Sequence, residues 1–355
     1  MTRRSWGLFA AMCLIWGIPY LLIRVAVRDF SPGTLVFVRT AIGGLVLLPF
    51  AFAAGGFGPV LRRWRPLLAF TVIEIAVPWL LLSDAERVLS SSLSGLLIAA
   101  VPMVGVVVAR MGGVDDRTGG VLRYVGLLLG LAGVALLLGL DVGQVRLGAL
   151  LEMAAVVVGY AVAPVIMSRR LADLPSIPVV SASLLLTAVG YLPYALVRWP
   201  DAISAKVAWS VAGLGVVCTA IAFVVFFALI AEIGPARASV ITFVNPAVAV
   251  LLGVLLLDEG FTQGIAVGFP LILLGSVLAT RRAAADPDPV SCDAAVPEAV
   301  LAETVAGGSG DDDQSTRTSP RGVSNTAATT PVSPSNGDNH STSTPSSGWR
   351  ADVPK

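Results

Sequence analysis

An acidic residue, Glu74, interrupts the apolar run TVIEIAVPWLLLSDAERVL at residues 71–89. A charged carboxylate at the centre of a membrane helix costs about 2.5–3.5 kcal/mol on insertion scales, so such residues face the protein interior or a wet pathway. There Glu74 could bind a cationic group or exchange protons. Alternatively, it only hydrogen-bonds a neighbouring helix or lies near the membrane surface. Pro78, one turn later, frees a backbone carbonyl and would give Glu74 a polar neighbourhood.

Two arginines also lie within apolar segments. Arg39 follows SPGTLVFV, and it could neutralise an acid or hold an anionic substrate. Because Arg39 is within two turns of a loop, its side chain could instead extend to the membrane interface. Arg24, near the end of its apolar segment, is predicted to be an interface anchor.

Aromatic and amide side chains supply further candidates. Trp16 and Tyr160 could line a cavity, or they could simply pack between helices. Asn245 lies inside an apolar segment, and a buried amide must find hydrogen-bond partners. Pro102 and Pro246 would interrupt helical hydrogen bonds and expose carbonyls to a pathway, or only bend their helices.

The elements that position these residues are predicted from composition. The 355 residues are 55% hydrophobic and 13% charged, about half the charged fraction of soluble domains. Apolar runs of about 20 residues recur without alternation, which predicts an all-α polytopic membrane protein rather than a barrel. Ten spans are expected, at about residues 5–26, 33–54, 67–83, 91–110, 121–140, 147–167, 177–197, 207–230, 236–256 and 262–280.

The orientation of the spans follows from the basic residues in the loops. With the N-terminus inside, the inner segments hold twelve arginines, and the outer loops hold four arginines and one lysine. This bias predicts a multi-pass protein of the cytoplasmic membrane with both termini in the cytoplasm. From residue 283 to 355 the chain is rich in Ser, Thr, Pro, Asp and Gly, which predicts a disordered cytoplasmic tail.

An internal repeat divides the membrane region. The stretches AAVPMVGVVVARMGGVDDR and TFVNPAVAVLLGVLLLDEG each have a proline followed thirteen residues later by an acid. The matching pairs, each separated by 144 residues, are Pro102 with Pro246, Asp115 with Glu259, and Trp16 with Tyr160. They predict two five-helix units, residues 1–140 and 141–282. Because five is odd, the two units must be inverted relative to each other, as in many secondary transporters.

Four stretches resemble EamA-type members of the drug/metabolite transporter superfamily, and together they span about residues 5–282. They are LIWGIPYLLIR, FVRTAIGGLVLLP, EIAVPWLLLSDAERVLSSSLSGLLIAAVP and the closing segment GPARASVITFVNPAVAVLLGVLLLDEGFTQGIAVGFPLILLGSVLATRR. The resemblance implies a ten-helix, two-repeat carrier with a central cavity that moves small metabolites or drugs, often outward. One departure is ARMGGVDDR, where the family usually has a glutamate close to the position of Asp115.

Three classes of function are compared. A secondary transporter would use an ion gradient, with protons as the first candidate, or the gradient of its small-molecule substrate. The sequence has no Walker A motif, which excludes ATP-driven transport by this chain alone. An enzyme acting on lipids is disfavoured, because the membrane region has no histidine and no paired nucleophile and base. A non-transporting sensor or scaffold acting through the polar tail stays open.

The remaining partners are few. The membrane lipid bilayer is the expected surrounding, and the net charge of +1 gives no reason to expect nucleic acid. No cysteine or histidine spacing suggests a metal site, and no cofactor is expected. Two Gly-xxx-Gly pairs, Gly126 with Gly130 and Gly264 with Gly268, are close-packing positions for helices. They leave a homodimer open.

Overall fold

The computed structural model describes residues 2–111, 120–141, 146–234, 238 and 240–280. Within these ranges all regular secondary structure is helical. The chain divides into two units, Met1–Val305 and Ala306–Lys355, and all the helices described below belong to the first. The predicted disordered tail and Asp115 lie outside the described residues.

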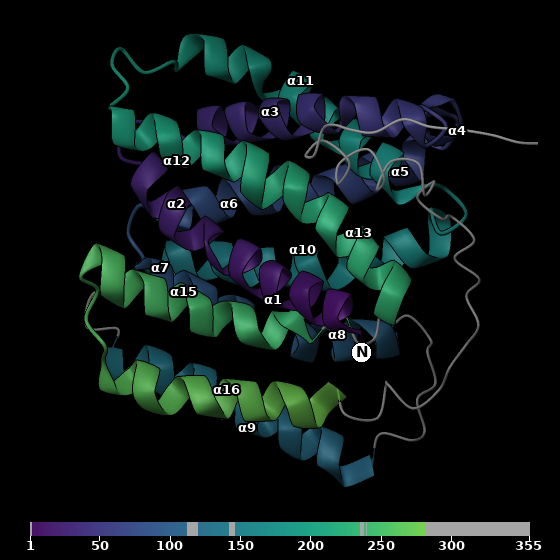
Figure 1. Cartoon of the computed structure of the whole chain (residues 1–355). Coiled ribbons are helices and arrows are strands. Elements are labelled where there is room, and N and C mark those ends of the chain that lie inside the picture. Colours follow the sequence, from purple (N-terminus) through teal and green to yellow (C-terminus); the bar gives the residue numbers. More distant parts are fainter. Residues whose placement is uncertain (1, 112–119, 142–145, 235–237, 239, 281–355) are drawn as a thin grey trace, which may run out of the picture. The chain divides into compact units, whose positions relative to one another are not determined.

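The helices follow one another along the chain as Figure 1 shows. In the first half they are α1 (Arg3–Gly17), α2 (Pro19–Ala26), α3 (Pro32–Ala53), α4 (Gly58–Arg62), α5 (Trp64–Phe70), η1 (Thr71–Ala76), α6 (Val77–Ala85), α7 (Ser91–Ile98), α8 (Val101–Met111) and α9 (Gly120–Asp141). In the second half they are α10 (Leu147–Arg170), α11 (Ser176–Val197), α12 (Ala205–Gly215), η2 (Val216–Ile221), α13 (Ala222–Ile233), α15 (Ile241–Leu257) and α16 (Gln263–Thr280).

Seven helical stretches of the described chain are long and apolar enough to cross a membrane. They are Arg3–Ala26, Pro32–Ala53, Trp64–Ala85, Ser91–Val108, Leu147–Arg170, Ser176–Val197 and Ala205–Ile233. Three shorter apolar helices, Tyr124–Leu136, Ile241–Leu257 and Gln263–Leu278, lie where the fifth, ninth and tenth spans are predicted. The prediction of an all-helical polytopic membrane protein is therefore confirmed, while the count of ten stays a prediction.

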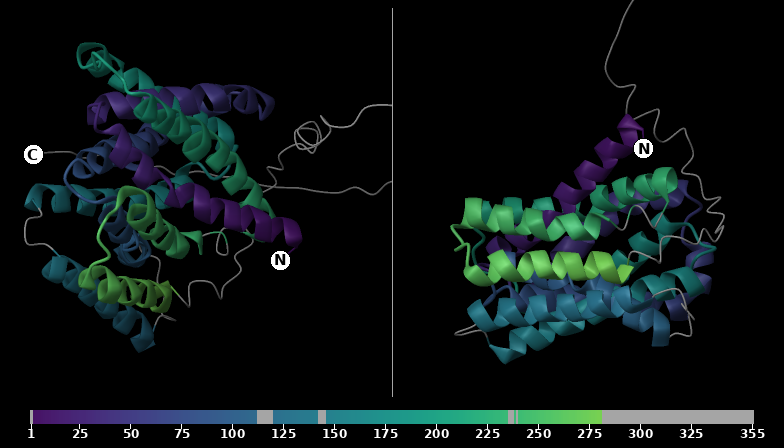
Figure 2. Two further views of the ribbon diagram at one scale, coloured as in Figure 1. Left: turned by 60° about the vertical axis from the view of Figure 1, so that its left-hand side comes forward. Right: turned by 90° about the horizontal axis from the view of Figure 1, so that it is seen from below.

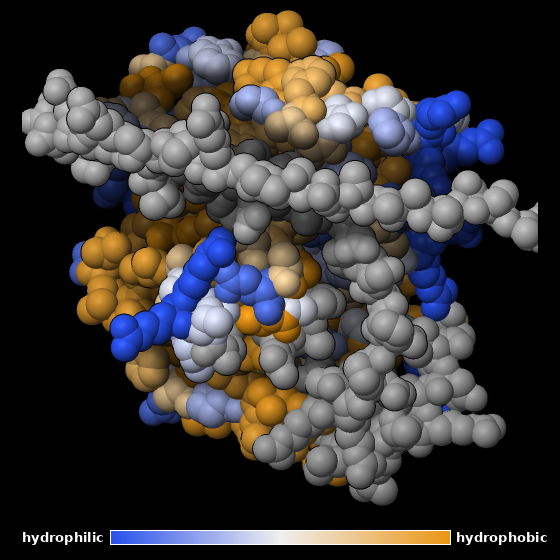
Figure 3. Space-filling model, turned by 45° about the vertical axis from the view of Figure 1, so that its right-hand side comes forward, coloured by the Kyte–Doolittle hydropathy of each residue, from blue (hydrophilic) through white to orange (hydrophobic). Residues whose placement is uncertain are grey.

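The outer surface of the bundle is apolar, as lipid contact requires. Large hydrophobic side chains point outward from several helices, among them Trp209 at 79% exposure and Leu196 at 72%. In Figure 3 hydrophobic side chains cover much of the visible face, and hydrophilic ones form separate patches. Since monomeric soluble proteins rarely expose apolar patches of such extent, this surface supports the membrane assignment.

Helices α3 and α11 pack against each other in opposite directions. Near the start of α3, a Cβ added at Gly33 would lie 2.7 Å from the ring of Tyr194, near the end of α11. Further along α3, a Cβ at Gly44 would lie 2.8 Å from Leu185, and the Ser181 hydroxyl donates to the Gly44 carbonyl at 3.3 Å. Glycine is required at these two positions because the partner side chains occupy the space of a Cβ. The bounds of the two helices differ by 144 residues at both ends.

Helices α9 and α16 form a second antiparallel pair, and they lie side by side in Figures 1 and 2. A Cβ at Gly275 would lie 2.4 Å from the backbone nitrogen of Gly130 and 2.6 Å from the oxygen of Gly126. A Cβ at Gly133 would lie 2.9 Å from the oxygen of Gly268. The glycines noted in the sequence therefore serve close helix packing within the chain.

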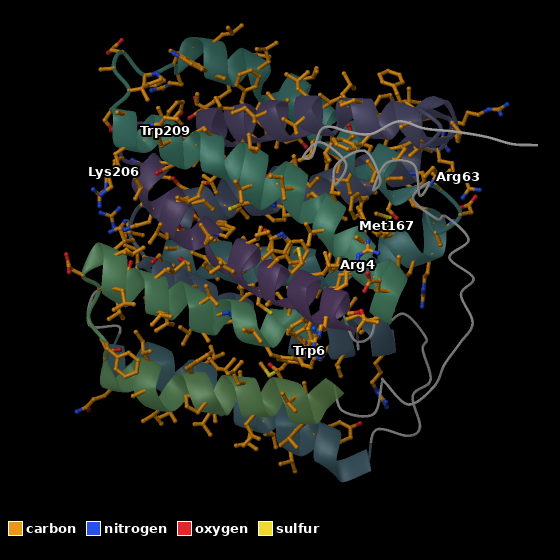
Figure 4. All side chains as sticks on the ribbon, in the orientation of Figure 1. Arg4, Trp6, Arg63, Met167, Lys206 and Trp209 are labelled. Atoms are coloured by element: carbon orange, nitrogen blue, oxygen red, sulfur yellow. The ribbon has the colours of Figure 1, made fainter. Side chains whose placement is uncertain are left out.

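Polar contacts gather at the two ends of the bundle. Arg4 and Arg63, both predicted to be on the inner side, lie toward one end of the helices in Figure 4, and Lys206, predicted to be outside, lies at the other. Arg4 forms an ion pair with Glu232 at 3.0 Å, and Arg63 forms one with Asp173 at 2.7 Å. This arrangement agrees with the predicted order of the spans. Which end faces the cytoplasm stays a prediction.

At the end that carries Lys206, Asp29 joins two segments distant in sequence. Its carboxylate accepts hydrogen bonds from the backbone N–H and the hydroxyl of Ser204, at 2.9 and 2.8 Å. These bonds, the backbone one first, lower the pKa of Asp29 below its usual value. A lowered folded-state pKa gives stability that is present at neutral pH and is lost as the pH falls below about 4.

We therefore expect Asp29→Asn to reduce the acid sensitivity of the detergent-solubilised protein. The midpoint of thermal unfolding is measured at pH 7 and at about pH 3, below the usual pKa of an aspartate, for both proteins. Acidification should lower the midpoint of unfolding more for the wild type than for the variant, because only the wild type has this carboxylate to protonate. Equal losses would contradict a role for the Asp29–Ser204 contact in stability.

Candidate functional site

Two π-helices interrupt the third and eighth predicted spans. They are η1 (Thr71–Ala76) and η2 (Val216–Ile221), which lie 145 residues apart. In the first, Pro78 lacks the N–H that would bond the carbonyl of Glu74, and the hydroxyl of Tyr191 donates to the carbonyl of Ala76 at 3.0 Å. Single-turn π segments occur frequently at functional sites. The two π-helices place irregular backbone, together with its side chains, in the middle of the bundle.

Arg39 on α3 points into the bundle, and its side chain is not extended toward the interface. The residue is only 7% exposed. Its Nε donates to the hydroxyl of Thr219 on η2 at 3.1 Å, and its guanidinium carbon lies 3.6 Å from the centre of the Trp79 ring. None of the ion pairs within the described ranges involves Arg39. The buried cation is thus held by a hydroxyl and an aromatic face. A desolvated contact between a cation and an aromatic ring contributes about 2 kcal/mol or more.

Tyr160 on α10 lies near this cation, and Glu74 on η1 lies near Tyr160. Tyr160 is close enough to interact electrostatically with both Glu74 and Arg39, and the Trp79 side chain lies next to it. The buried Oε2 of Glu74 has no hydrogen-bond partner among the described residues. We call Arg39, Glu74, Trp79, Tyr160 and Thr219 the central cluster. It combines a cation, an acid and aromatic faces contributed by both halves of the chain.

The approach of α10 to η1 depends on a glycine. A Cβ at Gly159 would lie 2.6 Å from the carbonyl oxygen of Ile73 and 3.0 Å from the ring of Pro78. Since neither group is the end of a flexible side chain, only glycine allows this contact. It sets Tyr160, the next residue, against the π-helix that carries Glu74.

Trp16 lies in a neighbouring aromatic group rather than in direct contact with Arg39. Its ring packs against Phe226 at 4.6 Å and Phe223 at 6.3 Å, both on α13. Phe223 in turn packs against the buried residues around Trp79. The spacing of 144 residues relates Trp16 to Tyr160 and also Phe223 to Trp79. Each half therefore supplies an equivalent aromatic contact next to the central cluster.

The remaining sequence candidates lie apart from the cluster. Asn245 is 9% exposed, and in its favoured orientation the amide nitrogen donates to the backbone oxygens of Ile241 and Cys13 at 3.0 and 3.2 Å. The bond to Cys13 ties α15 to α1. Pro246 lies inside α15, which continues to Leu257, whereas Pro102 is the second residue of α8, after the break that separates α8 from α7. A pathway role for these three residues stays a prediction.

Glu86 is a buried acid that the sequence does not single out. It directly follows α6 and is 0% exposed, and neither carboxylate oxygen has a hydrogen-bond partner in the described part of the chain. Arg24, which the sequence predicts to be an interface anchor, is half-buried and donates to the backbone oxygen of Glu86 at 2.5 Å. In the sequence, Glu86 resembles a loop residue because Asp84 and Arg87 flank it.

The order of these elements agrees with a known family. The model of the EamA-like transporter family matches residues 5–139 and again residues 147–281. The chain belongs to this family. The two matches cover all but the ends of the helices described above, and the residues of the central cluster come from both EamA-like segments. Among the described residues, no three His, Cys, Asp or Glu side chains gather as metal ligands would.

Other proteins of similar sequence carry transporter names. The inner membrane transporter YedA of Escherichia coli strain K12, itself uncharacterized, is 29% identical over 280 residues, covering 77% of this chain and 90% of that protein. The uncharacterized transporter YvbV of Bacillus subtilis strain 168 is 24% identical over 286 residues, with 78% and 92% coverage. A solved crystal structure with 22% identity aligns at a TM-score of 0.58, covering 79% of this chain and 98% of its own. That likeness shows the fold alone.

Proposed function

We propose that this EamA-like protein is a secondary transporter that moves a small metabolite or drug across the cytoplasmic membrane by alternating access. Membership of the family and the names of the relatives support transport. The central cluster is the observation that carries the proposal. It places a buried cation without an ion-pair partner in the described chain, and an acid with an unpartnered oxygen, in a bundle whose outer surface is apolar.

The arrangement of the helices supports an inverted repeat. The family model matches the chain twice, and α3 and α11 have bounds 144 residues apart yet run in opposite directions. The final helices of the two segments, α9 and α16, are antiparallel as well. In many secondary transporters with inverted repeats, the substrate site lies at the interface between the repeats near the bilayer midplane. The meeting of α3, η1 and α6 with α10 and η2 at the central cluster supports such a position for it.

Each residue of the cluster has a distinct role in the proposal. The guanidinium of Arg39 would hold an anionic group of the substrate, since charged hydrogen bonds of this kind are strong in a dry site. Glu74 would bind a cationic group or a proton as the pathway opens to one side and then the other. The rings of Trp79 and Tyr160 would pack against the apolar part of the substrate. The driving force is a proton gradient or the gradient of the substrate itself.

Metabolite profiling of overexpressing cells and their medium tests this function. We expect one class of compound to move with the wild-type chain and to move at least tenfold more slowly with Glu74→Gln, because loss of a charged contact weakens binding by about 1.5–3 kcal/mol. The matched control is Asp201→Asn, which makes the same acid-to-amide change at an exposed loop position. All three chains are compared at equal abundance in the membrane.

The alternative outcomes separate the competing functions. Equal movement with wild type and Glu74→Gln would retain transport and remove Glu74 from the mechanism. If no compound moves with the wild type in varied media, a non-transporting sensor or scaffold becomes the better explanation. A chain ending at Arg282 would then show whether the polar tail carries the activity.

A further inference from the structure

We propose that Glu86 is a proton-binding site at the end of the bundle that carries Lys206, where it keeps its proton while this end is closed and releases it when the end opens. The binding of the proton is independent of any transported compound. Only its use in coupling rests on the proposed transport function.

The contacts of Glu86 indicate a neutral acid. Its side chain is fully buried, and neither carboxylate oxygen accepts a hydrogen bond from a described residue. A buried ionised carboxylate without donors is very unfavourable, and such a group takes up a proton instead. The nearest cation, Arg24, donates to the backbone oxygen of Glu86. An ionised carboxylate would be the stronger acceptor for that guanidinium, so its choice of the neutral carbonyl also fits a protonated side chain.

Charged and titratable groups face Glu86 from several elements. They are Arg24 and Tyr20 on α2, Arg39 on α3, Tyr160 on α10, and Glu259 after α15. Of the two arginines, Arg39 is already engaged with Thr219 and Trp79. Only Arg24 is therefore placed to receive the carboxylate of Glu86 if that group ionises.

The carboxylate of Glu259 lies nearby and disfavours a negative charge on Glu86. The Glu259 carboxylate accepts hydrogen bonds from the backbone N–H of Ser91 at 2.7 Å, the N–H of Ser92 at 2.9 Å and the hydroxyl of Ser92 at 2.5 Å. Because like charges disfavour each other's ionisation, the nearby carboxylate of Glu259 favours the neutral form of Glu86.

These contacts hold together elements that must separate for this end to open. Arg24 on α2 binds the residue after α6, Glu259 caps α7, and Asp29 binds Ser204 before α12. Figure 1 shows α2, α7 and the start of α12 at the same end of the bundle. When they separate, water reaches Glu86 and Arg24 is free to pair with its carboxylate, so the proton leaves toward this side. The corresponding position in the second half, 144 residues later, is Ile230, so the site belongs to one end only.

Infrared difference spectroscopy of the purified full-length protein in detergent tests the site. At neutral pH the spectrum of the wild type should contain one C=O band of a protonated carboxylic acid that is absent from the spectrum of Glu86→Gln. This band should shift in D₂O. The matched control Asp201→Asn should remove carboxylate bands only, because Asp201 is exposed. A spectrum in which Glu86→Gln removes carboxylate bands instead would overturn the proposal.

Arg24→Gln provides a second measurement with Glu86 intact. The proposal expects the acid band to persist in this variant and to disappear at a pH about 1–3 units higher than in the wild type, because the cation that stabilises the ionised form is absent. Disappearance at the same pH in both proteins would contradict the role of Arg24. Since neither experiment uses a transported compound, failure here leaves the proposed transport function standing, and failure of transport leaves the proton site standing.

Discussion

Replacing Arg39 with glutamine is expected to cause a large loss of transport while leaving the chain folded in the membrane. The substitution removes the buried cation of the central cluster, its stacking on Trp79 and the charge that would hold an anionic group. Charged hydrogen bonds contribute about 1.5–3 kcal/mol, so transport should fall by about tenfold to a hundredfold or more. The measurement is the flux of the compound found by metabolite profiling, at equal abundance of each chain in the membrane.

Three variants separate charge from geometry in this prediction. Arg39→Lys keeps the charge but loses the planar group that stacks on the ring, so intermediate activity is expected. Thr219→Val removes the acceptor of one hydrogen bond, at 3.1 Å from Nε, and should reduce transport only severalfold. Arg198→Gln, at an exposed position, should transport like the wild type. Full activity of Arg39→Gln would contradict the assignment of the central cluster as the site.

A second large effect is expected from Gly275→Ala, which should destabilise the protein itself. The added Cβ would lie 2.4 Å from the backbone nitrogen and 2.6 Å from the Cα of Gly130. Backbone atoms of a helix cannot move aside as side chains do, so α9 and α16 would have to separate. Overpacking of this kind costs about 1–3 kcal/mol. Thermal unfolding in detergent and the yield of monodisperse protein measure the effect.

The control for this prediction is the same substitution in an open position. A Cβ at Gly148, on α10, meets no atom within 4 Å. Because alanine favours a helix over glycine by about 1 kcal/mol, Gly148→Ala should leave the protein unchanged or slightly more stable. Equal stability of the two variants would show that α9 and α16 do not approach as closely as described.

The limits of the spans could be predicted from the sequence because long apolar runs and turn residues mark them. The runs predicted at 33–54 and 177–197 correspond to α3 (Pro32–Ala53) and α11 (Ser176–Val197). Proline at a helix start and the polar residues before it fix such boundaries. The types of residue at the centre of the bundle were visible for the same reason, since a charge such as Arg39 or Glu74 is rare in an apolar run.

The contacts of these residues could not be predicted in the same way. The π-helices carry no hydrophobic pattern of their own, so the position of Thr219 opposite Arg39 was not evident. The partners of Asn245, the backbone oxygens of Ile241 and Cys13, could not be named from the sequence. The burial of Glu86 could not be predicted, because charged residues flank it in the sequence. In each case the deciding quantity is a contact between segments distant in sequence, which local pattern does not contain.

Transport by the purified chain alone is the most direct test of the central claim. The full-length wild type and Arg39→Gln are reconstituted in liposomes loaded with the unlabelled compound that profiling identifies, and entry of the labelled compound is followed. The proposed function predicts rapid accumulation with the wild type and accumulation at least about tenfold slower with Arg39→Gln. If the wild type also fails to exceed protein-free liposomes, this chain is not the carrier of that compound.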